Sequence, residues 1–338
     1  MMGSEPKSSV KLRAVIEEGS ILSSLRSHSL SPVFLDLLTS LSALLLLVIV
    51  LTLASPHFLT LSNLANVTRQ LAVLVIVSVG MTFVIISGGI DLSVGSVLAL
   101  AGVVLGGLVA RYEFTLPVAM LGAMIAGTLA GGLNGFLIGY ARIPPFITTL
   151  GMYSAARGLA LVYTNGLSIS VRNPNLRFVA EGSLLGLPVP LLVAASVTGL
   201  GMYVLGRTVV GRYTYAIGGN EEAARLSGID VRRLKLIIYG LGGLCAGIGS
   251  IIWTARIGSG QPIAGTFLEL DAIAAVVIGG TSLSGGKGNL LGTVVGALII
   301  GFIRNGLNLL NINAFWQMVV IGSVIVLAVF IDRLRERH

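Results

Sequence analysis

The sequence predicts an all-α integral membrane protein with about ten transmembrane helices, an internal repeat, and broken or half helices. Mean hydropathy is +0.94, and 54% of the 338 residues are hydrophobic whereas only 11% are charged. Apolar stretches close to the roughly 20 residues that cross a bilayer follow one another along the chain. Glycine is abundant, at 45 residues, which is typical of helices that pack closely in lipid. These three features exclude an ordinary soluble domain.

The apolar stretches divide the chain into an N-terminal segment at 1–34, a membrane domain at 35–332 and a tail at 333–338. We expect the first apolar run to be retained, because no small-residue cleavage site follows it and many more apolar runs do. The eighth span is short enough to be a half-helix or a re-entrant segment. The ten expected spans are 35–54, 65–87, 93–110, 117–140, 146–163, 189–206, 234–255, 268–281, 289–310 and 315–332.

Basic residues predict the orientation of these spans. With the N-terminus inside, most of the 22 Lys and Arg residues fall in the N-terminal segment, the inner loops and the tail. The positive-inside rule therefore places both termini in the cytoplasm. Membrane topology therefore explains the basic residues behind the net charge of +8, and we do not expect a nucleic acid partner.

Two glycine-containing strings, at 87–95 and 279–287, resemble each other and predict breaks between helices. In the first, two glycines free the backbone to turn, and Asp91 can cap the following helix. Paired strings of this kind indicate an internally repeated transporter, with the breaks near the solute path. The candidate break and translocation residues are Gly88, Gly89, Asp91, Ser93, Gly279, Gly280, Thr281 and Ser282.

The second string also contains Gly286 followed by Lys287, as in a phosphate-binding loop. Such a loop needs a glycine five positions before the Gly-Lys pair and a Ser or Thr after it. Thr281 and Gly288 occupy those two positions here. The chain is therefore expected to hold no nucleotide of its own.

The fourth span carries glycine at every fourth position, which predicts that another helix approaches it closely. These residues are Gly127, Gly131, Gly135 and Gly139. Pairs with the same spacing predict close packing of the seventh and ninth spans, namely Gly243 with Gly247 and Gly292 with Gly296.

A polar, charged stretch at 207–235 interrupts the apolar runs, and its part at 207–233 is the predicted cytoplasmic loop. It contains the signals of a short helix, with Asn220 as N-cap, acidic residues in the first turn and Gly228 as the stop. Asp230 is expected to cap the next apolar helix. A bare linker would not need this chemistry, so the loop is a candidate docking surface for a partner. The residues involved are Gly219, Asn220, Glu221, Glu222, Ala223, Ala224, Arg225, Leu226 and Gly228.

Polar residues inside spans are costly in lipid and are therefore candidates for function. We select Asn134, Asn305 and Asn308 as candidates for the solute path. Arg157 and Arg304 fall toward the outer halves of their spans, where snorkelling explains them. Trp253 and Trp316 lie near the outer boundary and are expected to anchor the chain at the interface.

The sequence is poor in groups for catalysis. None of its three histidines lies in a span, and the acidic residues near the membrane show no metal-ligand or proton-relay spacing. The single cysteine, Cys245, excludes a disulfide framework. We therefore expect no catalytic, cofactor-binding or metal site, and we do not expect an enzyme. A secondary carrier and an intramembrane enzyme are the competing classes.

Taken together, these segments resemble the permease subunits of bacterial ABC importers of the ribose type, which carry monosaccharides and related solutes. The resemblance covers nearly the whole chain after about residue 35 and leaves the N-terminal segment without a family role. Its most specific strings are those at 80–82, 87–96, 162–166, 211–229, 261–262, 269–277, 279–282 and 306–310.

The resemblance implies a multi-pass protein of the bacterial cytoplasmic (inner) membrane that forms the path for a ribose-like monosaccharide. It implies three protein partners: a second permease copy, a cytoplasmic ATPase that holds ATP and Mg²⁺, and a soluble sugar-binding protein outside. The helix from Asn220 to Ser227 would then be the coupling helix, which docks in a cleft of the ATPase. A permease for a nucleoside or another small polar solute is the alternative within the family, and an ATP-independent carrier is the alternative outside it.

Overall fold

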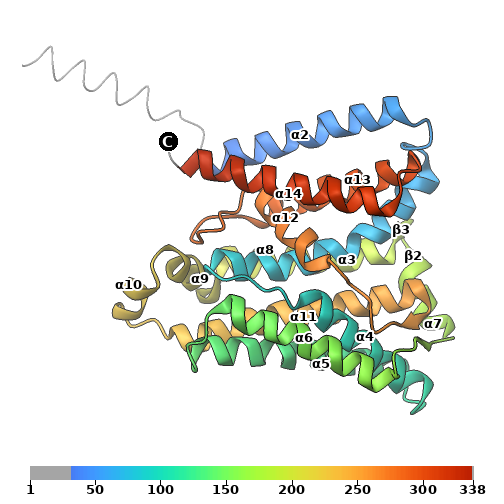
Figure 1. The fold of residues 1–338 in the computed structure, drawn as a ribbon, viewed down its shortest axis with the longest axis horizontal. Helices are drawn as coiled ribbons and strands as arrows, with labels where there is room; N and C mark the ends of the chain where they lie inside the picture. The colour runs from blue at the N-terminus through green and yellow to red at the C-terminus, as the bar shows by residue number, and fades with distance from the viewer. Residues whose placement is uncertain (1–31, 337–338) are drawn as a thin grey trace, which may run out of the picture.

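The computed structural model describes residues 32–336, so the predicted segment at 1–34 and the end of the predicted tail lie largely outside it. Each predicted span coincides with a helix, and the long helices lie roughly along one common direction (Figure 1). These helices are α2 (Pro32–Ala54), α3 (Leu61–Ile86), α4 (Val94–Ala110), α5 (Leu116–Gly139), α6 (Pro145–Thr164), α8 (Val189–Arg207), α11 (Val231–Ile257), α12 (Leu268–Ile278), α13 (Leu290–Leu309) and α14 (Ala314–Glu336).

Within residues 32–336, six helices are long and apolar enough to cross a membrane: α2, α3, α5, α8, α11 and α13. Helix α4 and the part of α14 at Ala314–Leu327 are apolar but shorter, and α12 has only 11 residues. The all-α class is thus confirmed, and the apolar helices agree with a membrane protein. A total of ten crossings stays a prediction.

The molecule has two distinct ends, which the remaining small elements mark (Figure 1). Helices α9 (Val209–Gly219) and α10 (Glu221–Leu226) lie at one end, here called the α10 end. At the opposite α7 end lie α7 (Pro174–Glu181) and two pairs of antiparallel strands with two residues each. Strand β1 (Ile169–Ser170) pairs with β4 (Ser259–Gly260), and β2 (Ser183–Leu184) pairs with β3 (Leu187–Pro188).

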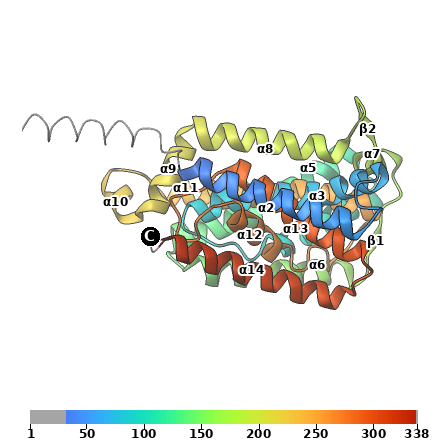
Figure 2. The same ribbon diagram turned by 90° about the horizontal axis from the view of Figure 1, so that it is seen from above.

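Helix α3 forms the centre of the bundle. It packs against α8, α11, α12 and α13, and 89% of its most apolar window is buried. By contrast, only 11% of the apolar window of α2 is buried. Seen from above, α8 lies along one side of the molecule and α14 along the other (Figure 2). Apolar side chains that face outward from such peripheral helices suit a lipid environment.

Helices α5 and α11 pack backbone to backbone through the predicted glycine stripe. A Cβ atom placed on Gly135 would lie 2.6 Å from the Cα of Leu236, and one on Gly139 would lie 2.8 Å from the carbonyl oxygen of Arg232. Gly131 lies equally close to Gly243. The predicted pair on α13, Gly292 and Gly296, also packs directly against backbone atoms, those of Gly279 and Ala275 at the end of α12. The close packing expected from these spacings is confirmed.

Two irregular segments return into the interior between helices. The first, 87–93, runs inward from the end of α3 before α4 begins (Figure 1), and Asp91 and Ser93 in it are buried. The second, 258–267, was not predicted; it precedes α12, which begins after Phe267 in the left-handed conformation (φ +66°). The second segment meets the first turn of α4, which directly follows the first segment, because a Cβ on Gly265 would lie 2.8 Å from the carbonyl oxygen of Gly95.

Gly131→Ala tests whether this packing controls stability. The added methyl group would meet Gly243 Cα and N at 2.9 Å, and overpacking of this kind costs about 1–3 kcal/mol. We expect a clearly lower midpoint of thermal unfolding in detergent, measured by fluorescence-detected size-exclusion chromatography.

Gly132→Ala is the matched control, because no described atom lies within 4 Å of a Cβ at that position. Alanine is about 1 kcal/mol more favourable than glycine inside a helix, so this variant should equal or exceed the parent protein. Equal midpoints for the two variants would contradict the packing argument.

Candidate functional site

The short helix predicted in the cytoplasmic loop is present as α10. The Asn220 side chain accepts a hydrogen bond from the backbone N–H of Ala223 at 2.9 Å, which makes Asn220 the N-cap. Gly228 follows the helix with φ +85°, and Asp230 caps α11 by accepting from the N–H of Arg233 at 3.2 Å. The predicted start, stop and second cap are therefore confirmed.

The charged side chains of α10 pair with one another and with α11. Glu221 accepts hydrogen bonds from Arg225 at 3.0 Å and from Lys235 of α11 at 2.6 Å. These partly exposed pairs each contribute no more than about 1 kcal/mol, but together they fix the direction of the helix. The side chain of Leu226, by contrast, is 81% exposed. Helix α10, here called the platform, therefore presents the large apolar side chain of Leu226 to its surroundings.

Helix α9, which leads into α10, was not predicted. The Thr208 hydroxyl caps it by accepting from the N–H of Gly211 at 3.4 Å. Its buried residues Gly211, Thr214 and Ile217 recur every three positions, a helical signal that the polar character of the loop obscured. The Tyr215 hydroxyl donates to the carbonyl oxygen of Gly288 at 2.7 Å, which ties α9 to the loop after α12.

Four glycines join α9 to the neighbouring helix ends, and we call them the glycine junction. They are Gly88, Gly218, Gly285 and Gly286. Gly218, near the end of α9, lies directly against Gly286 and the carbonyl group of Ile86 at the end of α3. The N–H of Gly286 donates to that same Ile86 carbonyl oxygen at 2.9 Å. A Cβ on Gly285 would lie 2.9 Å from the Cα of Gly88. No side chain separates these backbones.

The second predicted string therefore lies at the α10 end, beside α9, and does not itself return into the interior. Gly280 has φ +87°, as a helix stop requires, and Gly279 packs against Gly292 of α13. Thr281 and Ser282 are buried. Within the described part of the chain, the Thr281 hydroxyl has no hydrogen-bond partner.

The first predicted string forms a buried polar cluster with α5. A carboxylate oxygen of Asp91 accepts hydrogen bonds from the N–H and the hydroxyl of Ser93, at 2.8 and 2.6 Å. The Asn134 amide donates to the same hydroxyl at 2.9 Å. The expectation that Asp91 caps α4 is therefore wrong. Ser93 is the N-cap residue, and the Asp91 side chain bonds to Ser93 and not to the N–H groups of the first helical turn.

Snorkelling is also the wrong explanation for the two arginines within spans. Arg157 donates to the carbonyl oxygens of Pro262 and Ala264 at 2.6 and 2.8 Å, and so holds the returning segment 258–267. Arg304 donates from one nitrogen to both carboxylate oxygens of Asp271 at 2.7 Å. Each arginine therefore bonds to a partner within the protein that lies far away in the sequence.

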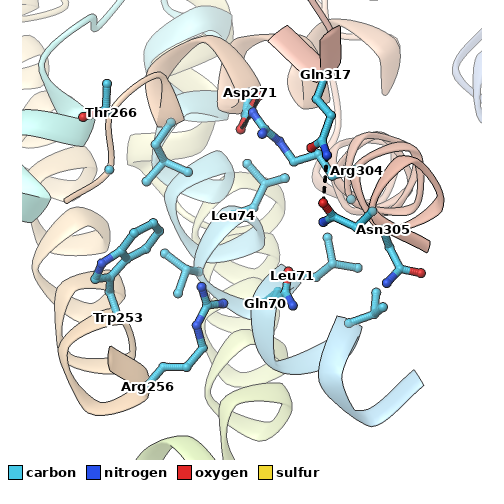
Figure 3. Close-up of a pocket in the computed structure, with 16 residues that line it drawn as sticks. Gln70, Leu71, Leu74, Trp253, Arg256, Thr266, Asp271, Arg304, Asn305 and Gln317 are labelled. Atoms are coloured by element: carbon cyan, nitrogen blue, oxygen red, sulfur yellow. Dashed lines mark hydrogen bonds and ion pairs between the residues drawn. The ribbon is translucent and has the colours of Figure 1, made fainter. Parts of the chain in front are cut away.

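A cavity of about 260 Å³ with a mixed polar and apolar lining lies toward the α7 end, between α3, α11, α12, α13 and α14 (Figure 3). Trp253 and Arg256 form one side of it, with the guanidinium carbon 5.4 Å from the centre of the indole ring. Trp253 thus lines a cavity, whereas only interfacial anchoring was expected of it. The Arg304–Asp271 pair lies on another side.

The candidate path residues fall in two places. Asn305 and Asn308 line the cavity, whereas Asn134 belongs to the Asp91 cluster. Asn305 exchanges hydrogen bonds with Asn63 at 2.9 and 3.0 Å, and Asn308 accepts from Gln317 at 2.8 Å. In the described part of the chain, no group of three or more His, Cys, Asp or Glu residues is placed to hold a metal ion.

Comparison with known proteins adds independent information. The family described as "Branched-chain amino acid transport system / permease component" matches residues 63–329. The ribose import permease protein RbsC of Escherichia coli (strain K12) is 47% identical over 301 residues, covering 88% of this chain and 94% of the relative. RbsC of Bacillus subtilis (strain 168) is 47% identical over 292 residues, covering 86% and 90%.

A more distant relative is the D-allose transport system permease protein AlsC of Escherichia coli (strain K12). It is 39% identical over 283 residues, which cover 84% of this chain and 87% of the relative. No solved structure matches the chain.

Proposed function

The chain belongs to the family of branched-chain amino acid transport system permease components, within which it is of the ribose type, and we propose that it forms the membrane path by which an ATP-driven importer carries D-ribose. The observation that carries this proposal is the 47% identity to two ribose import permeases over nearly their whole length. The 39% identity to a D-allose permease makes allose the second candidate sugar. Hydrolysis of ATP belongs to a separate subunit, which binds ATP and Mg²⁺.

The α10 end is proposed to face the cytoplasm, in the inner membrane of a bacterium. Helix α2 begins at the α10 end and α14 finishes there (Figure 1), which supports two cytoplasmic termini. Arginines of the loop, among them Arg207, Arg212 and Arg232, gather on the same side. This agrees with the positive-inside rule.

The ATPase is proposed to dock on α10, which serves as the coupling helix. Support comes from the distribution of polar and apolar groups on this helix. Its charged groups pair with one another and with Lys235 of α11, whereas Leu226 is exposed and available to a partner. An exposed Leu side chain beside paired charges offers a partner an apolar contact, and full burial of such a side chain is worth about 1.5–3 kcal/mol.

Motion of α10 is proposed to reach the membrane helices through the glycine junction. The end of α9 touches the end of α3 and the loop after α12 at once. Because these contacts join backbone to backbone, changes of side-chain rotamer cannot absorb a displacement. ATP-driven movement of the platform would therefore shift α12 relative to its neighbours and alternate access to the path.

The soluble sugar-binding protein is proposed to dock at the α7 end. The predicted external connection folds there into α7, whose N-cap Asn173 accepts from two backbone N–H groups at 3.0 and 3.2 Å. A second permease copy is proposed as a further partner. On α6, a Cβ at Gly151 or Gly158 would meet no described atom within 4 Å, so these glycines are free to pack against another chain.

The proposed function is tested by reconstitution of the chain in liposomes with its ATPase and binding protein. We expect ATP-dependent uptake of labelled D-ribose, which ADP does not support. The same assay with D-allose ranks the second candidate sugar. Uptake that persists in energised, ATP-free vesicles would contradict the proposal and would indicate a secondary carrier.

Leu226→Asp tests the docking surface. A charge at this position would be buried against the ATPase, and loss of a central apolar contact weakens association by at least about tenfold. We expect the ATPase to be lost from pull-downs of the detergent-solubilised permease. Leu185→Asp is the control, because Leu185 is fully exposed in the β2–β3 turn at the opposite end. If neither variant loses the ATPase, the docking assignment is wrong.

Gly218→Ala tests the glycine junction. Its methyl group would collide with the Ile86 carbonyl and the N–H of Gly286, and so break the hydrogen bond between them. We expect the ATPase to remain bound while ribose uptake per ATP hydrolysed falls about tenfold or more, as for other displaced transmission elements. Gly219→Ala should retain normal coupling, because a Cβ there meets no described atom within 4 Å. Normal coupling in both variants would refute the transmission route.

A further inference from the structure

The cavity at the α7 end has a chemistry that helix packing alone does not require. Polar side chains inside membrane spans are costly and are therefore candidates for function by default. Here α3, α11, α13 and α14 each contribute an amide or a guanidinium group, among them Gln70, Arg256, Asn308 and Gln317. Apolar side chains of α3, including Leu71 and Leu74, complete the lining (Figure 3).

The charges of this cavity are largely compensated. Arg304 and Asp271 neutralise each other through two 2.7 Å contacts. The N-terminus of α12 points a positive dipole toward the cavity, but Glu269 and Asp271 already occupy its first turn, where carboxylates compensate that dipole. What remains are amide groups, which offer both donors and acceptors, and the Arg256 guanidinium, a donor that lies over the Trp253 indole. A neutral polyol, in which each hydroxyl is donor and acceptor, can bond to all of these groups.

Trp253 adds the apolar surface that a sugar ring needs. An indole combines a large apolar face with a rigid geometry, and such a face suits the C–H side of a sugar. Small-ligand sites typically combine apolar surface with a few polar groups that fix orientation. The cavity has both features at about 260 Å³.

The position of the cavity fits a site on the path. It lies beside the start of α12, where the chain returns through 258–267 in place of a full-length helix. Solute sites in transporters lie next to discontinuous helices of this kind. The other end of α12 leads to the glycine junction, so the cavity is connected to the element that moves.

We infer that this cavity binds one neutral monosaccharide and is the first site that the solute occupies in the permease after its delivery. This inference rests on the proposed function for the identity of the sugar, D-ribose. The residues that contact the sugar are Gln70, Trp253, Asn308 and Gln317.

Intrinsic fluorescence of the full-length permease in lipid nanodiscs tests the inference. The chain has two tryptophans, and Trp316 is exposed and does not line the cavity. Trp316→Phe therefore leaves Trp253 as the sole indole. We expect a saturable change of its emission on titration with D-ribose, without ATPase or binding protein, and no such change with the sugar acid D-gluconate.

A second pair of variants separates binding from general effects. Gln70 lines the cavity and its side chain is otherwise exposed, so Gln70→Ala in the Trp316→Phe background should fold normally. Loss of its contacts should raise the ribose concentration at half-saturation about tenfold. Asn175→Ala, an exposed position on α7 outside the cavity, should leave that concentration unchanged.

The outcomes separate this inference from the proposed function. If Trp316→Phe supports ribose uptake in the complete importer but its emission does not respond to ribose, the cavity is not a sugar site and the proposed function stands. If D-gluconate binds more tightly than D-ribose, a neutral ligand is the wrong class. If the complete importer takes up no ribose, the proposed function fails, and a saturable response to ribose would still support a sugar site.

Discussion

Direct contact between backbones, made possible by glycine, is the constraint on which the rest of this structure depends. Lipid is as apolar as the helix surfaces, so burial of apolar area does little to hold membrane helices together, and close approach becomes the main source of attraction. The α5–α11 pair, the α12–α13 pair and the glycine junction all use it. The same device therefore builds the stable part of the bundle and links the platform to it.

Glycine contacts bring helices close, but they cannot satisfy the polar groups of irregular backbone at membrane depth. Such backbone is tolerated only where protein groups take the place of water. In each returning segment, side chains of the protein bond to the polar groups. Arg157 donates to two carbonyl oxygens of 258–267, and the Asp91–Ser93–Asn134 cluster bonds the start of α4 to α5. The segment 258–267 then meets the first turn of α4 at Gly265 and Gly95, where again no side chain intervenes.

The sequence predicts the features that depend on local chemistry. The helices follow from apolar runs of spanning length, and α10 follows from Asn220, the acidic first turn and Gly228, because caps act over three or four residues. Features that depend on distant partners could not be predicted. Arg157 is reasonably interpreted as snorkelling until its partners, more than 100 residues later in the chain, are in place. Asn305 and Asn308 were identified by their cost in lipid, but only the fold brings Asp271, Arg304 and Trp253 to the same cavity.

The short length of α12 gives these separate features a common mechanical basis. Its 11 residues span about 16 Å at 1.5 Å per residue, roughly half the thickness of a bilayer core. One end leads to the loop held by α9, and the other carries Asp271 at the cavity. The proposed mechanism requires this short helix to move as one body against α13, which it contacts through glycine backbone and not through interlocking side chains. Because Arg304 is on α13 and Asp271 on α12, such movement must stretch or re-form their ion pair. In the proposed mechanism, displacement of α9 would therefore reach this ion pair through α12, and ATP hydrolysis on the partner subunit would act on the solute through the same helix.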